Sequence, residues 1–234
     1  GYGLICRLFL SAMLLAAAAL VLAGQINYPS LPLTRRPISW HAFFEKRVLP
    51  VAVVTYFSTL VYGGIVSFIV LYSEEIGVKN GGLFFLAYAA AVSLVRPQSG
   101  KLFDRRGPGP VLTAGFLCTM TGFILLAASH GLTGFLAAAA VIGAGNGMVW
   151  PTIQTMVINM VAPQRRGVAN STYFSALDLG IGTGSIFLGW LANLTSISTM
   201  YFVSGLILIV PLVYFFLYVL KDYNEKMVRG EAND

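Results

Sequence analysis

The chain has 234 residues, of which 57% are hydrophobic and only 10% are charged, and its mean hydropathy is +0.77. A soluble domain has about 25% charged residues, so this composition excludes an ordinary soluble protein and indicates an integral membrane protein. The net charge of +6 comes from basic residues that gather in a few short segments, which indicates membrane topology rather than a nucleic-acid partner.

Seven apolar runs are long enough to cross a membrane as helices, for which about 20 residues suffice. The runs are continuous rather than alternating, so we expect helices and not a β-barrel. The sequence therefore predicts an all-α integral membrane protein with seven transmembrane helices, at residues 4–24, 49–72, 82–99, 109–128, 135–160, 169–192 and 200–220.

Basic residues recur at every second loop, which is the pattern of cytoplasmic loops. The positions are Arg35, Arg36, Lys46 and Arg47, then Lys101, Arg105 and Arg106, then Arg165 and Arg166, and finally Lys221, Lys226 and Arg229. This pattern predicts a cytoplasmic tail at 222–234 and, with seven helices, an N-terminus outside the cell. Residues 1–24 are then a transmembrane helix, and the proline-containing segment 25–47 is a cytoplasmic loop between two helical bundles.

The second and third runs carry polar residues with different expected roles. Tyr56 and Thr59 share a helix face that can line water or pack against a neighbour. The third run is predicted to end at Arg96-Pro97-Gln98, because proline usually marks a helix end. Arg96 can then extend its charged group to the cytoplasmic surface.

The fifth run combines small residues with an amide-rich side. Gly143, Gly145 and Gly147 permit close contact with a neighbouring helix. Asn146, Trp150 and Gln154 follow at helical spacing, so the sequence predicts an amide, an indole and a second amide on one side of the span.

The sixth run has a polar stripe that includes Ser175 and Asp178. This stripe is not expected to face lipid, because a carboxylate near the bilayer centre costs at least about 2.5–3.5 kcal/mol on insertion scales. Gly180, Gly182 and Gly184 add a surface of small residues for a packed neighbour. Asp178 is either a functional group, namely a protonatable site or a counter-charge for a cationic substrate, or an interhelical hydrogen-bonding group.

Between the third and fourth runs lies a charged hairpin, Gly100-Lys101-Leu102-Phe103-Asp104-Arg105-Arg106-Gly107. Asp104 is placed to accept hydrogen bonds from a helix N-terminus or to pair with Arg165 and Arg166 of the next cytoplasmic loop. We expect such a contact to form only when the cytoplasmic side is closed, so the hairpin is predicted to act as a latch.

Gly100, Leu102, Asp104, Arg105 and Gly107 resemble the G-x-L-x-D-R-x-G signature of the major facilitator superfamily, in the copy between the eighth and ninth helices. Residues 162–170 resemble the loop between its tenth and eleventh helices, and Asp178-Leu179-Gly180 is similar to the eleventh helix of the drug-efflux branch. In this register, 1–24 is the sixth helix, 25–47 the central loop and 48–221 the C-terminal six-helix bundle. The chain is then expected to be part of a longer one.

The resemblance implies two six-helix bundles that rock about a central cavity in the plasma membrane. It implies half of a secondary transporter for small organic molecules, expected to export drug-like or amphipathic compounds by proton antiport, with the N-terminal half as partner. The implied pathway residues are Asp178, Ser175, Asn146, Trp150, Gln154, Tyr56 and Thr59. The implied gating residues are Gly100, Leu102, Asp104, Arg105, Arg106, Gly107, Arg165 and Arg166.

Two alternatives stay open at this point. The same scaffold serves uptake of sugars or metabolites, and seven helices with an external N-terminus also fit a membrane receptor. The sequence has no nucleophile–base pair, phosphate-binding loop or metal-spaced cluster, so neither an enzyme nor a cofactor or metal site is predicted.

Overall fold

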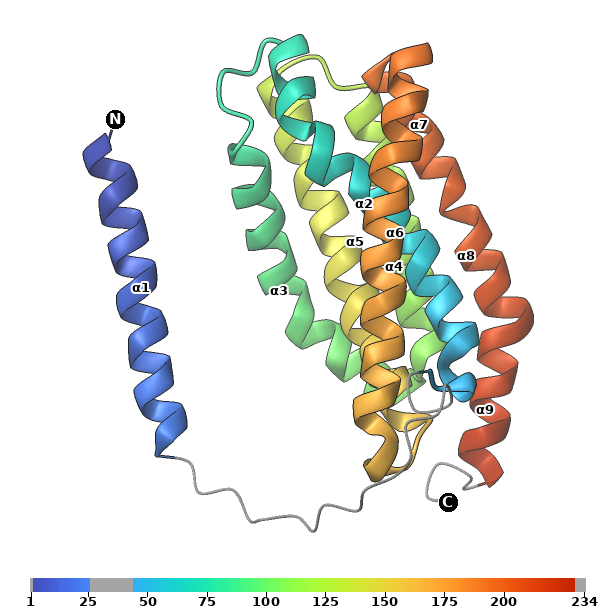
Figure 1. Ribbon diagram of the computed structural model, residues 1–234. Coiled ribbons are helices and arrows are strands. Elements are labelled where there is room, and N and C mark those ends of the chain that lie inside the picture. The colour runs from blue at the N-terminus through green and yellow to red at the C-terminus, as the bar shows by residue number, and fades with distance from the viewer. Residues whose placement is uncertain (1, 26–43, 230–234) are drawn as a thin grey trace. The chain divides into compact units, whose positions relative to one another are not determined.

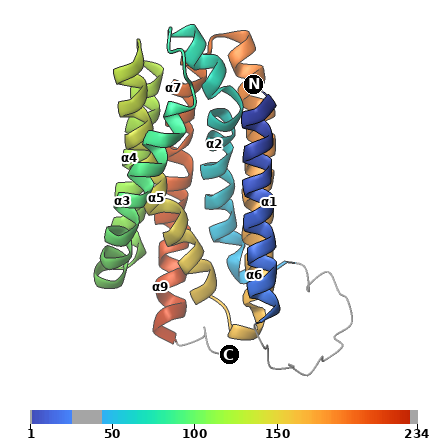
Figure 2. The same ribbon diagram turned by 90° about the vertical axis from the view of Figure 1, so that its left-hand side faces the viewer.

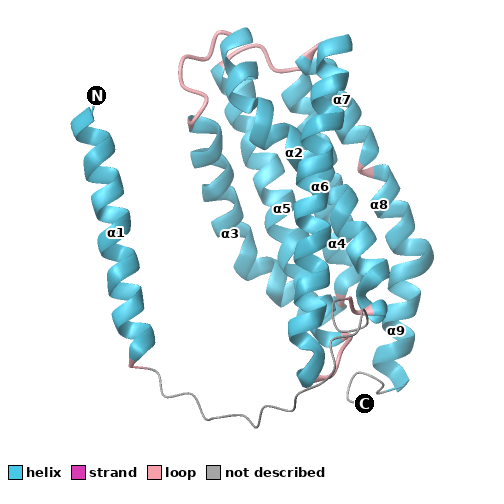
Figure 3. Ribbon diagram, in the orientation of Figure 1, coloured by secondary structure: helices cyan, strands magenta, loops and turns pink. Residues whose placement is uncertain are grey.

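The structure, a computed structural model, describes residues 2–25 and 44–229. Every secondary-structure element in these residues is a helix, as Figure 3 shows, which confirms the predicted all-α fold. Most of the predicted 25–47 loop and the last five residues of the predicted 222–234 tail lie outside the described residues.

The helices follow the predicted runs closely (Figure 1). The first, α1, belongs to a separate compact unit, and the helices from residue 44 onward form a second unit, called the bundle here. The bounds are α1 Tyr2–Gly24, α2 Leu49–Glu75, α3 Leu83–Arg106, α4 Pro108–Ala127, α5 Leu132–Asn159, α6 Arg166–Leu194, α7 Ile197–Ile207, α8 Ile209–Tyr214 and α9 Leu220–Arg229. Short 3₁₀ turns at Lys46–Val48 and Pro163–Arg165 precede α2 and α6, and a π-helical turn at Phe215–Val219 joins α8 to α9.

Five helical stretches among the described residues are long and apolar enough to cross a membrane. They are Lys46–Glu75, Pro108–Ala127, Leu132–Asn159, Pro163–Leu194 and Ile197–Glu225. Within α1, Phe9–Gly24 is a shorter apolar helix. The remaining predicted span, α3, is interrupted by the polar sequence Arg96-Pro97-Gln98, which dilutes its apolar character.

The predicted end of the third helix at Arg96-Pro97-Gln98 is wrong. Helix α3 continues through Pro97 to Arg106, and Gly107 follows as its cap with φ +74°. Proline in a helix interior removes one backbone hydrogen bond but does not end the helix when the flanking turns are held in place. The segment 100–106 is thus the last two turns of α3, and the hairpin turn itself is reduced to Gly107. Glycine adopts this left-handed conformation without steric cost, and Pro108 starts α4 directly after it.

The most extensive helix contacts join α2 to α6, α4 to α5 and α3 to α5. Figure 2 shows α3, α4 and α5 grouped on one side of the bundle. A Cβ atom added at Gly143 would lie 3.0 Å from the Cα of Tyr88, and one at Gly147 would lie 3.2 Å from the Cα of Val92. The predicted role of the α5 glycines in close helix contact is therefore confirmed, because a larger residue would force α3 away from α5.

The glycines of α6 divide between two faces. A Cβ atom at Gly180 would lie 2.6 Å from the backbone oxygen of Tyr56, and Gly184 lies against the backbone of Leu60, both on α2. Gly182 has nothing within 4 Å of an added Cβ atom, because a residue two positions away points to another side of the helix. Gly180 and Gly184 thus form the predicted packing surface, and Gly182 faces outward.

Candidate functional site

A cavity of about 460 Å³ opens between α3, α5 and α6. It is called the α3–α5–α6 cavity below. Of the predicted pathway residues, Trp150 and Gln154 line it. Its other lining residues are Arg96, Ser99, Gly100, Phe103 and Asp104 of α3, Pro151, Thr152 and Thr155 of α5, and Tyr173, Phe174 and Leu177 of α6. The structure therefore joins two predicted pathway residues with two residues of the predicted gating motif.

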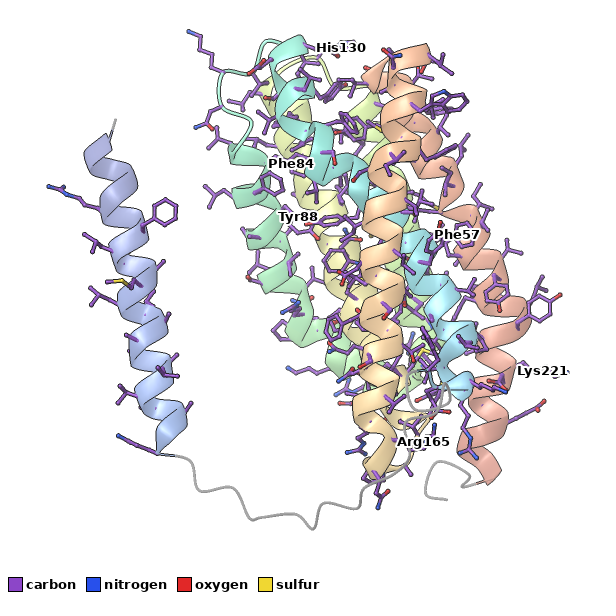
Figure 4. The ribbon with its side chains drawn as sticks, viewed as in Figure 1. Phe57, Phe84, Tyr88, His130, Arg165 and Lys221 are labelled. Atoms are coloured by element: carbon purple, nitrogen blue, oxygen red, sulfur yellow. The ribbon has the colours of Figure 1, made fainter. Side chains whose placement is uncertain are left out.

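Trp150 on α5 belongs to an aromatic cluster with rings from two other helices. The ring of Tyr62 on α2 lies edge-on to Trp150 with 4.8 Å between ring centroids, and the ring of Tyr88 on α3 lies 6.2 Å from that of Tyr62. Figure 4 labels Tyr88 and Phe84 on α3. Edge-on aromatic pairs of this kind add about 0.5–1.5 kcal/mol beyond their area burial. These contacts fix the indole of Trp150 at the edge of the cavity.

Asn146 is buried in the contact between helices rather than exposed in the cavity. Its side-chain Nδ2 donates a hydrogen bond to the hydroxyl of Tyr88 at 3.2 Å. The hydroxyl of Thr119 on α4 donates to Asn146 Oδ1 at 3.5 Å. Asn146 thus connects α3, α4 and α5, and its amide is satisfied by protein groups.

We expect Tyr88→Phe to lower the free energy of unfolding by about 1–3 kcal/mol, because the buried amide of Asn146 loses its acceptor without a replacement. Thermal unfolding of the purified protein in a fixed detergent measures the change. Tyr218→Phe is the matched control, because the side chain of Tyr218 is exposed. Equal melting temperatures for the two variants would contradict a stabilising role for the Asn146–Tyr88 hydrogen bond.

Ser175 and Asp178 lie on the outer face of α6, which is defined here by Ser175, Asp178, Gly182 and Thr183. All four residues are exposed in the bundle. With Phe44, Leu179 and Ile186 they line an open groove of about 650 Å³. In the stretch Pro163–Leu194, which contains α6, only 17% of the most apolar part is buried. In Lys46–Glu75, which contains α2, the buried share is 56%. This face of α6, which carries the carboxylate of Asp178, therefore has no packing partner within the bundle.

The two predicted residues of α2 have different surroundings. The hydroxyl of Tyr56 lies 3.0 Å from that of Thr183 at the edge of the outer face of α6. Thr59 is completely buried in the contact with α6, where its hydroxyl donates to the carbonyl oxygen of Thr55 at 2.9 Å. The structure thus places the hydroxyl of Tyr56 beside Thr183 of the groove and places Thr59 between the two helices.

The predicted gating residues gather at one end of the bundle, called the basic end here. Arg105 and Arg106 end α3, and Arg165 and Arg166 lie where α6 begins. Figure 4 shows Arg165 and Lys221 at this end and His130 at the opposite end. Gly100 and Asp104 line the α3–α5–α6 cavity, Leu102 is half-buried, and Asp104, Arg105 and Arg106 are exposed.

Arg165 forms an ion pair with Glu45 instead of the predicted partner Asp104. Glu45 is buried just before α2, and its backbone N–H donates to the hydroxyl of Thr172 on α6 at 2.9 Å. Its other carboxylate oxygen accepts from the backbone N–H of Arg47 at 3.3 Å. This contact holds the starts of α2 and α6 together, and the sequence interpretation missed it because Glu45 lies among basic residues of a predicted loop.

Tyr88, Tyr62 and Tyr173 were also missed. Each lies in an apolar run, where an aromatic residue is usually a packing residue, and no local pattern distinguishes the three. The cavity role of Arg96 was hidden by the expected helix end at Pro97. A helix that continues past this proline places Arg96 in the helix interior rather than at its end.

Comparisons with known proteins agree with the fold. The family model of the Major Facilitator Superfamily matches residues 51–234. The chain is 27% identical over 180 residues to the staphylopine export protein of Staphylococcus aureus, covering 75% of this chain and 45% of that protein. It is 25% identical over 202 residues to the multidrug resistance protein MdtG of Escherichia fergusonii, covering 79% of this chain and 48% of that protein.

A third relative is the quinolone resistance protein NorA of Staphylococcus aureus, at 24% identity over 151 residues, which covers 62% of this chain and 38% of that protein. Among solved structures, a crystal structure of the peptide transporter POT in complex with sulfate is similar with a TM-score of 0.65 and 21% identity. That likeness covers 83% of this chain and 40% of the transporter, and it shows the fold alone. The chain spans less than half the length of each of these proteins.

Proposed function

The chain belongs to the Major Facilitator Superfamily, and we propose that it forms the C-terminal half of a secondary transporter that exports small organic molecules in exchange for protons. Membership in this family makes the chain part of a multi-pass membrane transporter, rather than an enzyme or the membrane receptor that the sequence also allowed. The bundle supplies one wall of the transport cavity, and an N-terminal half supplies the other.

The exposed carboxylate of Asp178 carries this proposal. Asp178 lies on a face of α6 that has no packing partner within the bundle, and it lines the open groove. Lipid contact would cost at least about 2.5–3.5 kcal/mol at the bilayer centre, so this face requires water or a second polar surface. A water-filled cavity between two bundles would supply both water and a facing polar surface. There the carboxylate can take up and release a proton during the transport cycle.

Export is favoured over uptake by the relatives. Three of them carry names that describe export or drug resistance. A proton that crosses 100 mV releases about 2.3 kcal/mol, which supports roughly fiftyfold accumulation without a nucleotide site. We further propose that the basic end faces the cytoplasm, because short loops rich in Lys and Arg stay on that side.

The test is reconstitution in lipid vesicles with an imposed proton gradient. The chain joined to its N-terminal half should move a fluorescent amphipathic dye at a rate that rises with the gradient and collapses with a protonophore. The 234-residue chain alone should give no flux, because one wall of the cavity is absent. Gradient-driven flux by the isolated chain would refute the half-transporter assignment, and dye flux that ignores the protonophore would refute proton coupling.

A further inference from the structure

We propose that the α3–α5–α6 cavity binds a carboxylate-type oxyanion of the exported molecule, with the guanidinium of Arg96 as its counter-charge. This inference rests on the proposed function and specifies the substrate class. It makes Arg96 a substrate-binding residue rather than a surface anchor.

Arg96 lies near the middle of α3. Thirteen residues precede it in the helix and ten follow, which places it about 20 Å and 15 Å from the two helix ends at 1.5 Å per residue. An ionisable side chain in the interior of a helix of a membrane protein usually faces a water-filled cavity or another protein group. Arg96 is exposed in the bundle and lines the α3–α5–α6 cavity, so its surroundings indicate a pathway residue.

The positive charge of Arg96 is not neutralised within the described part of the chain. The ion pair recorded there joins Arg165 to Glu45. Asp104 is the carboxylate of the cavity lining, and it follows Arg96 by eight residues on the same helix, a rise of about 12 Å. The two groups form no ion pair in the described structure. A guanidinium with five N–H donors therefore faces the cavity and is available to an oxyanion.

A second group of the lining also lacks a partner. The indole Nε1 of Trp150 is buried and has no hydrogen-bond partner among the described residues. Indole is a donor only, so a bound acceptor would satisfy it. The amide of Gln154 lies one helical turn further along α5 in the same lining. Arg96 and Gln154 thus offer N–H donors in one lining. A negatively charged acceptor gains a charge-assisted hydrogen bond from Arg96, which is stronger than the bond that an uncharged acceptor makes.

The experiment compares one molecule in two charge states. The complete transporter is produced in cells that lack their own exporters, and efflux is measured for a fluorescent aromatic carboxylic acid and for its amide. Arg96→Gln should lower efflux of the acid at least tenfold and change efflux of the amide less than twofold, because a charge-assisted hydrogen bond is lost only for the acid. Arg96→Lys should restore part of the activity. Lys79→Gln is the matched control, because it removes one exposed positive charge outside both the cavity lining and the hairpin 100–107.

Equilibrium dialysis of the same acid and amide against the purified transporter reads binding whether or not transport occurs. Tighter binding of the acid that Arg96→Gln removes would support the proposal. Equal effects of Arg96→Gln on acid and amide, or equal binding of both by the wild type, would overturn it. In that outcome, dye export that still depends on the proton gradient leaves the proposed function standing, so the two failures are distinguishable.

Discussion

Replacing Asp178 by Asn in the complete transporter is expected to abolish proton-driven export while leaving the protein folded. Asn keeps the shape and hydrogen-bonding capacity of the side chain but cannot exchange a proton at physiological pH. We expect the initial efflux rate in the presence of a proton gradient to fall at least tenfold, to the rate without a gradient. Exchange of labelled for unlabelled substrate at equal pH should continue, because it needs no net proton movement.

Two variants serve as controls for this result. Asp178→Glu keeps the carboxylate and should retain part of the gradient-driven rate. Glu74→Gln removes a carboxylate near the end of α2, where the side chain is exposed and outside the groove, and should leave the rate unchanged. Wild-type rates and an unaltered pH dependence for Asp178→Asn would instead assign Asp178 to helix packing or to the contact with the other half.

Gly184→Ala is expected to destabilise the bundle by about 3 kcal/mol, at the upper end of the usual cost of overpacking. A Cβ atom at this position would lie 2.7 Å from the carbonyl carbon of Leu60 and 2.8 Å from its Cα atom. These are backbone atoms, so α2 and α6 must separate because no side chain can rotate out of the way. Since α2 and α6 share one of the most extensive contacts of the bundle, the loss should be global.

Gly182→Ala provides a matched control two residues away on the same helix. Nothing lies within 4 Å of an added Cβ atom there, and alanine is favoured over glycine in a helix by about 0.5–1 kcal/mol. The melting temperature should therefore fall for Gly184→Ala and stay equal or rise slightly for Gly182→Ala. A similar melting temperature for both variants would show that α2 and α6 do not approach as closely as described.

Long apolar runs are the part of this protein that the sequence predicts best. A span needs about 20 apolar residues, and its backbone groups are satisfied only within a helix, so length and continuity are sufficient evidence. The glycines of α5 could also be assigned to close helix contact from the sequence, because a residue without a side chain lets the backbone of a neighbouring helix approach. The polar face around Asp178 was also predicted, since helical spacing alone brings Ser175 and Asp178 to one side.

The partners that Asn146 and Arg165 have on neighbouring helices were not predicted. Asn146, Trp150 and Gln154 share one side of α5 in the sequence, yet the structure buries Asn146 against Tyr88 and leaves Gln154 in the cavity. The spacing of residues on one helix does not show along which residues a neighbouring helix stays in contact with it. Arg165 is a second example, because its pairing with Glu45 depends on the starts of α2 and α6 lying side by side.

The sequence by itself determined that this chain is helical, spans a membrane and resembles its family, because hydropathy and a turn motif are local properties of consecutive residues. The tertiary structure alone decided which polar residues line a cavity and which are buried in the contacts between helices. The continuation of α3 beyond Pro97 is the clearest case, since proline weakens one helical turn and only the surrounding contacts determine whether the helix survives it. That outcome places Arg96 in the interior of α3, where it lines the α3–α5–α6 cavity.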